Sequence, residues 1–254
     1  MKLGLVTYNM AKDWDVSTII ESCAVAGFEG VELRTTHAHK VEVELSASQR
    51  QEVRKRFEDS PVELAGLGSA FDYHSTDADE VRSNIEGTKA YAQLAADVGA
   101  PGVKVRPNGL PEGVPVAKTL EQIGLSVREC GEFAADLGVQ IRVEVHGAGT
   151  SEIPNMRMIM EMADHPNVFV CWNSNQGDVE NGSVAHNFML LKDWIQLVHI
   201  NELYRKEYPW RELFALLRGI GYSGYCLAEI PESNDPIRLM NYYRALWEAF
   251  RGER

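Results

Sequence analysis

The feature that most constrains the fold of this chain is a unit that recurs along it: a short β-branched run, a polar turn and a helical pattern. Successive runs begin roughly 27 to 41 residues apart, and strands that alternate with helices at this spacing predict parallel β-α-β units. The predicted strands begin at Leu3, Val31, Val62, Val103, Ile141, Val168, Ile195 and Tyr225.

The segments between these runs carry apolar residues at three- and four-residue spacing, which is typical of helices that bury one face. Eight such units in 254 residues match the size of a (β/α)8 barrel, so we predict an α/β fold with a single domain over residues 1–254. An open doubly wound sheet is the competing architecture, because strand spacing alone does not show closure. The predicted helices include Asp15–Ala26, Ala47–Glu58, Ala78–Val98, Lys118–Leu137 and Arg211–Ile220.

The charge balance narrows the classes of partner. The chain has 25 Lys and Arg against 37 Asp and Glu, a net charge of −12, so neither nucleic acid nor an anionic membrane is expected as a partner. No apolar run approaches the ~20 residues of a membrane span. The four cysteines form no C-x-x-C pair and lie in apolar stretches, which indicates buried reduced thiols in a cytoplasmic protein.

Polar residues recur at the ends of the last four predicted strands. Glu144, Asn173, His199 and Glu229 each stand near the end of one strand, where a barrel carries its reactive residues. Carboxylate, amide and imidazole groups together suit a divalent ion such as Mn²⁺, Mg²⁺, Co²⁺ or Zn²⁺. A metal that holds two vicinal oxygens acidifies the C–H between them, and the two glutamates would then act as base and acid.

Other polar side chains near strand ends are candidates for contact with a substrate. Lys104 and Arg106 end the fourth strand, where they would bind substrate oxygens or neutralise the glutamates, and Glu32 would counter them. His74 follows the third strand, and His146 is expected to line the pocket two residues after Glu144. The alternative is a purely structural role, in which the strand-end carboxylates only form buried ion pairs with cations such as Lys104.

The segments VEVHG, CWNSNQGD, VHINELYR and LAEIP resemble the fifth to eighth strands of the xylose isomerase-like TIM barrels. This group includes sugar phosphate isomerases/epimerases, ketose 3-epimerases, inosose dehydratases and AP endonuclease IV, and FEGVEL and GYSGYCLAEI extend the resemblance over essentially the whole chain. The resemblance implies that Glu144, His199 and Glu229 bind the metal. It also implies that the two glutamates exchange a proton of the substrate carbon, and that Arg205 contacts substrate oxygens.

The chain departs from the family pattern after the sixth strand. The family usually has D-x-x-H there, whereas this chain has Asn173-Ser174-Asn175-Gln176. An amide oxygen still ligates a hard cation but adds no charge, so a weaker metal site is expected. Gln176 takes the place of an imidazole that the epimerases use beside the substrate. The endonuclease branch is the least expected, because its three-zinc cluster needs more ligands than the seven histidines of this chain supply.

These residues predict a metal-dependent isomerase or epimerase that acts on a small unphosphorylated sugar, polyol or keto-sugar by proton transfer next to a carbonyl. No glycine-rich loop follows the seventh or eighth strand, where barrels often bind phosphate. A lyase or dehydratase of inosose or 3-keto-glycoside type begins with the same proton abstraction and is the first alternative. The second is a non-catalytic carbohydrate-binding barrel with a degenerate metal site. A homo-oligomer is a family-level expectation.

Overall fold

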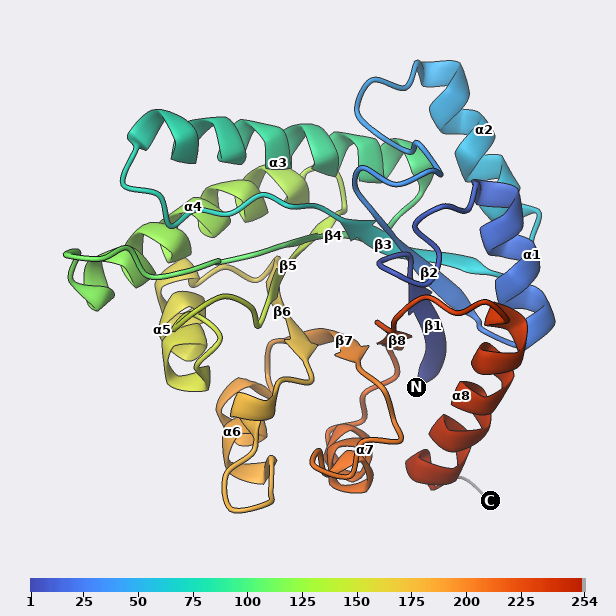
Figure 1. Ribbon diagram of the computed structural model, residues 1–254. Coiled ribbons are helices and arrows are strands. Elements are labelled where there is room, and N and C mark those ends of the chain that lie inside the picture. Colours follow the sequence, from blue (N-terminus) through green and yellow to red (C-terminus); the bar gives the residue numbers. More distant parts are fainter. Residues whose placement is uncertain (253–254) are drawn as a thin grey trace.

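Eight parallel strands pair in chain order, and β8 pairs with β1, so the sheet closes on itself in the computed structural model (Figure 1). Closure confirms the predicted barrel and excludes the open sheet. The structure describes residues 1–252, so the last two residues of the predicted domain lie outside the described part. Each strand begins within one residue of its predicted start: β1 (Lys2–Val6), β2 (Gly30–Arg34), β3 (Glu63–Gly68), β4 (Gly102–Val105), β5 (Gln140–Glu144), β6 (Val168–Asn173), β7 (Ile195–Ile200) and β8 (Tyr225–Ala228).

The helices lie around the outside of the barrel (Figure 1). Helix α4 begins and ends two residues earlier than predicted: its N-cap is Pro115, and residues 136–138 form a turn that ends at Gly138, whose φ is 68°. A 3-10 turn, η1 (Gln176–Asp178), follows β6. The helices are α1 (Val16–Ala26), α2 (Ala47–Glu58), α3 (Ala78–Val98), α4 (Val116–Ala135), α5 (Ile153–Ala163), α6 (Ala185–Leu191), α7 (Trp210–Gly219) and α8 (Pro236–Arg251).

The interior of the barrel changes from apolar to polar along the strands. Cys171, Leu197 and Leu227 belong to a small buried cluster inside the barrel. Side chains two residues apart on a strand share a face, so the next interior positions on β6, on β7 and just after β8 are polar. The predicted active-site residues therefore stand directly above an apolar floor, while the larger core lies between the strands and the helices.

All four cysteines are free and buried, as predicted. Burial raises the pKa of the Cys23 and Cys226 thiols to about 12, which keeps both protonated at neutral pH. Across residues 1–252, no helix combines the length and the apolar character needed to cross a bilayer.

Candidate active site

Strand register brings the four predicted metal ligands to one rim of the barrel. Asn173 of β6 pairs with His199 of β7, and His199 pairs in turn with Leu227 of β8, two residues before Glu229. Glu144 ends β5, and its Oε1 atom accepts a hydrogen bond from Asn173 Nδ2 at 3.2 Å. Parallel strands end at the same rim, so residues far apart in the sequence meet here.

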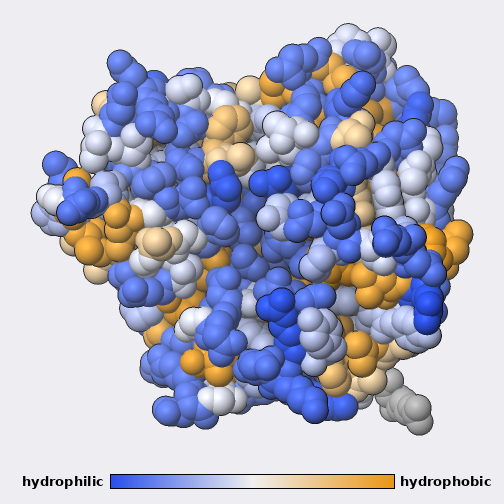
Figure 2. All heavy atoms as spheres, viewed as in Figure 1, coloured by the Kyte–Doolittle hydropathy of each residue, from blue (hydrophilic) through white to orange (hydrophobic). Residues whose placement is uncertain are grey.

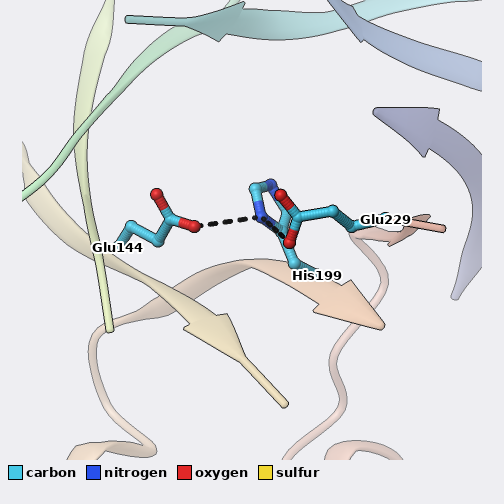
Figure 3. A group of neighbouring side chains, drawn as sticks. All are labelled: Glu144, His199 and Glu229. Carbon is cyan, nitrogen blue, oxygen red and sulfur yellow. Dashed lines mark ion pairs between the residues drawn. The ribbon is translucent and has the colours of Figure 1, made fainter. Parts of the chain in front are cut away.

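His199 lies between the two glutamates (Figure 3). Its Nδ1 atom is 3.6 Å from Glu144 Oε1 and 3.7 Å from Glu229 Oε2. One ligand atom from each of the three residues lies within 4.8 Å of the others, so the three form a group that can hold a metal ion. His199 and Glu144 are buried, whereas the Glu229 side chain is 19% exposed, so the group opens toward solvent on the Glu229 side.

A third carboxylate stands behind the imidazole. Glu32 Oε1 of β2 is 3.3 Å from His199 Nε2, and Gly68 of β3 makes room for it, because a Cβ at Gly68 would lie only 2.8 Å from that oxygen. Burial lowers the pKa of His199, but Cys171 and Glu32 more than offset this, and the pKa lies well above its ordinary value. A carboxylate in this position would fix the orientation of a ligating histidine and leave Nδ1 available to a metal.

Lys104 supplies a buried cation beside the group. Its Nζ atom is 2.7 Å from Glu144 Oε2, and both side chains are at most 6% exposed. Burial would raise the pKa of Glu144, but Lys104 and His199 together hold it well below its ordinary value. Burial raises the pKa of Glu229, although the His199 charge opposes it. Glu144 therefore forms the buried ion pair with Lys104 that the non-catalytic alternative predicts, and it also belongs to the three-residue group.

The charge and the unpaired acceptors of the site fit a divalent cation. The raised pKa keeps His199 protonated without a metal, and a cation on Nδ1 would displace that proton. The buried centre would then hold three carboxylates and one ammonium, a net charge of −2, from Glu32, Glu144, Glu229 and Lys104. Asn173 Oδ1 and His199 Nδ1 are buried without a hydrogen-bond partner among the described residues. Unpaired buried polar atoms are costly, and a divalent ion held here would bind Asn173 Oδ1 and the deprotonated His199 Nδ1 and neutralise the centre.

A cavity of about 410 Å³ opens above this centre. Hydrophilic side chains surround the hollow at the middle of this face (Figure 2). Glu144, Asn173 and Glu229 line the cavity, whereas His199 lies beneath it. Four of the predicted substrate-binding residues also line it: Lys104, Arg106, His146 and Arg205. His146 Nδ1 is 2.8 Å from Asn108 Oδ1, which fixes the orientation of its ring.

The other two predicted substrate-binding residues do not line this cavity. His74 lies to one side, with Nδ1 3.3 Å from Asp72 Oδ1. Gln176 is exposed on η1 and lines a neighbouring hollow together with Tyr204 and Trp210. His74 stands between β3 and α3, and Gln176 begins η1 three residues after β6 ends, so strand register fixes the position of neither.

Several lining residues are not predicted from the sequence as binding residues. Arg34, Asn175 and Asn201 stand two residues after Glu32, Asn173 and His199 respectively, and all three line the cavity. Strand alternation would have predicted all three, because a residue two positions after an interior strand residue points to the same side of the sheet. Asn9 and Glu202 also line the cavity, and no pattern in the sequence marks them.

The model of the xylose isomerase-like TIM barrel family matches residues 20–247 of this chain. The chain belongs to this family. The match confirms the resemblance carried by the strand-end segments, and the closed barrel agrees with it. As in other xylose isomerase-like barrels, the polar residues of the site stand at the carboxyl ends of the strands.

Named relatives of this xylose isomerase-like barrel are sugar epimerases. The L-ribulose 3-epimerase of Methylomonas sp. (strain DH-1) is 23% identical over 227 residues, which cover 84% of this chain and 78% of the relative. The D-psicose 3-epimerase of Clostridium cellulolyticum H10, solved with D-tagatose, superposes over all of both chains with a TM-score of 0.83 and 16% identity.

Two further solved structures share the fold. The 3-keto-D-glucoside 4-epimerase YcjR of E. coli has a TM-score of 0.81 and 17% identity, over 98% of this chain and 99% of its own. The IOLI protein, solved with a bound zinc atom, has a TM-score of 0.74 and 16% identity, over 98% of this chain and 96% of its own.

Proposed function

We propose that this protein is a metal-dependent sugar isomerase or epimerase, which acts on a small unphosphorylated sugar, polyol or keto-sugar by proton transfer next to a carbonyl. The observation that carries the proposal is the convergence of Glu144 and Glu229 on one nitrogen of His199 at the floor of a polar cavity. The sugar epimerases among its relatives support the same reaction class.

The proposed metal ligands are Glu144, Asn173, His199 and Glu229, and the ion is Mn²⁺, Mg²⁺, Co²⁺ or Zn²⁺. The zinc atom in the IOLI protein supports a metal in a barrel of this kind. When bound, such an ion would polarise the substrate carbonyl and so acidify the adjacent C–H. The amide of Asn173 adds no charge, so this chain should bind its metal more weakly than a relative with a carboxylate there.

The two glutamates carry the proton in this proposal. Glu144 comes from β5 and Glu229 from the end of β8, so they approach the cavity from separate strands. One carboxylate removes the proton from the carbon next to the carbonyl, and the other delivers a proton to the opposite face of that carbon. The result is inversion at one carbon, while Arg106, His146 and Arg205 bind the substrate oxygens.

The test uses purified protein that is stripped with a chelator, reloaded with each of the four metals and incubated with a panel of ketoses and keto-glycosides. Glu144→Gln should lower turnover at least about a hundredfold, because a positioned acid–base group contributes that much or more. Glu161→Gln removes an exposed carboxylate from the outer helix α5 and is the matched control. Unchanged turnover of every substrate in Glu144→Gln would overturn the proposal.

Product analysis separates the lyase alternative in the same experiment. An epimerase or isomerase returns a product of unchanged mass, whereas a lyase releases water or an alcohol. Both begin with the same proton abstraction, so Glu144→Gln should stop either reaction. A protein that binds sugars but neither retains a metal nor converts any substrate would instead be the non-catalytic barrel.

A further inference from the structure

We propose that the substrate carries a carboxylate, which Arg34 and Arg106 hold on the wall of the cavity formed by β2 to β4. The inference rests on the proposed function for the reaction at the other end of the substrate, and it narrows the substrate to acidic keto-sugars such as ketohexuronates. Three features of the cavity carry it: its local charge, the lack of a close carboxylate partner for either arginine, and their placement on one wall of the cavity.

The cavity has an excess of cations in a strongly acidic chain. The chain has a net charge of −12, yet the cavity lining holds four Lys and Arg side chains against three Glu. Two of these cations have close carboxylate partners. Lys104 lies 2.7 Å from Glu144, and Arg205 Nη2 lies 3.1 Å from Glu202 Oε2. The two that remain are Arg34 and Arg106.

Arg34 has no carboxylate within ion-pair distance among residues 1–252. Its Nη1 atom is 3.3 Å from His37 Nε2, and its guanidinium lies 5.0 Å from the centre of the Tyr8 ring. A neutral imidazole and an aromatic ring orient the guanidinium without neutralising it. Arg34 therefore presents an oriented and uncompensated positive charge to the cavity.

Arg106 is also incompletely partnered. Its Nη2 atom donates to the Ala70 carbonyl oxygen at 2.7 Å, and its nearest carboxylate, Asp72 Oδ2, is 4.0 Å away. Asp72 is itself engaged by Asn108 Nδ2 at 3.0 Å. Arg106 Nε is buried and has no hydrogen-bond partner in the part of the chain that the structure describes. An unpaired buried guanidinium nitrogen beside a cavity is a donor that a ligand oxygen can satisfy.

The two arginines stand on either side of a position without a side chain. Register pairs Arg34 of β2 with Gly68 of β3, and Gly68 with Lys104 of β4, two residues before Arg106. Gly68 places no side chain between them, and the Glu32 carboxylate occupies the space beside its Cα, so the ligand carboxylate would lie on the solvent side of Glu32. Guanidinium donors match the two oxygens of a carboxylate.

The surroundings favour a carboxylate over a phosphate. Phosphate sites in barrels use the backbone N–H groups of glycine-rich loops after β7 and β8. The segments that follow these strands here, residues 201–209 and 229–235, contain no glycine. The charge is instead supplied by side chains on the opposite wall, so the acidic group would lie away from Glu229 and the reacting carbon.

The test is calorimetric titration of the metal-loaded protein with D-tagaturonate, D-tagatose and D-tagatose 6-phosphate, which differ only at C6. D-tagaturonate should bind at least about tenfold more tightly than D-tagatose, since a charge-assisted hydrogen bond contributes about a ten- to a hundredfold in affinity. Arg34→Gln and Arg106→Gln should each reduce this acid-to-neutral preference about tenfold or more, and Arg34→Lys should restore part of it. Arg157→Gln, on the outer helix α5, removes the same charge and should leave the preference unchanged.

Equal binding of the acid and the neutral sugar would overturn the inference. So would an acid preference that persists in both arginine variants, because the carboxylate would then bind elsewhere, as at the metal. Tighter binding of the 6-phosphate than of the uronate would show that the cavity selects a phosphate, and it would overturn the carboxylate assignment. Thermal unfolding of each variant verifies that it is folded. Binding and turnover are measured separately, so the two proposals can fail independently. An acid preference that depends on the arginines, without turnover of any substrate, overturns the proposed function and supports this inference.

Discussion

His199 Nε2 lies 3.3 Å from Glu32 Oε1, on the side of the imidazole opposite the two glutamates that face Nδ1. Glu32 comes from β2, across the barrel from β7, so the contact spans the interior. It assigns the two nitrogens of the ring to different tasks. Nε2 faces a buried carboxylate that orients the ring, and Nδ1 faces the proposed metal.

Glu32→Gln should weaken metal binding about ten- to a hundredfold, because a carboxylate behind a ligating histidine contributes that much to affinity. Equilibrium dialysis against Mn²⁺ measures the change. Glu202→Gln removes the same charge from the cavity rim without approaching His199, and it should have a much smaller effect. Equal weakening in the two variants would show that overall charge, and not ring orientation, sets the affinity.

Lys104→Met should destabilise the metal-free protein by about 3–5 kcal/mol, because it leaves the buried Glu144 carboxylate without its cation. The double variant Lys104→Met/Glu144→Gln should recover much of this loss, since both charges are then gone. Urea unfolding measures the free energies. Lys55→Met breaks an exposed pair with Asp59 on α2 and should change stability little. A double variant no more stable than Lys104→Met would contradict this account.

Asn173→Asp should strengthen metal binding and weaken the metal-free protein. The new carboxylate would stand 3.2 Å from Glu144 Oε1, where the Asn173 amide now donates a hydrogen bond. Without a cation the two negative charges repel, whereas with one they add to the ligand charge and should tighten binding about tenfold. The melting temperature with and without Mn²⁺ measures both effects. A variant with a smaller metal-induced shift than the wild type would rule out Asn173 as a ligand.

Asp178 should make the stability of the protein depend on pH. Burial raises the pKa of Asp178 from 3.8 to about 8, although the Asn175 N–H and the Tyr208 hydroxyl donate to it. Between pH 4 and pH 8 the folded state keeps a proton that the unfolded state has lost, so stability falls as the pH rises, by at most about 6 kcal/mol.

Asp178→Asn has no such proton and should lack this component of the pH dependence. Chemical unfolding at pH 5, 7 and 9 measures the free energies. The free energy of unfolding of Asp178→Asn should increase relative to that of the wild type as the pH rises. Parallel stability curves for the two proteins would show that Asp178 titrates normally.

The fold followed from local patterns in the sequence. Each β-branched run predicts one strand because strand residues alternate faces over a short distance, and the starts fall within one residue of the observed ones. Helix ends are less well defined by the sequence. The pattern over Lys118–Leu137 misplaced α4 by two residues, because apolar spacing continues into the turn at Gly138.

The site was predictable where a residue ends a strand and uncertain where it stands in a loop. Glu144, His199 and Asn173 are fixed by register, so they meet as predicted. His74 and Gln176 stand in loops whose direction no local pattern specifies, and they lie outside the cavity. The charge on Arg34 is readable from the sequence, but its lack of a carboxylate partner depends on contacts between distant strands.

The central claim is that Glu144 and Glu229 exchange a proton next to a carbonyl, and deuterium incorporation tests it most directly. Metal-loaded protein is incubated in D2O with ketoses and ketohexuronates, and NMR follows the hydrogens on the carbons beside the carbonyl. The wild type should exchange one such hydrogen for deuterium, while Glu144→Gln and Glu229→Gln should each slow this exchange at least about a hundredfold. Exchange that proceeds at the wild-type rate in both variants would contradict the claim.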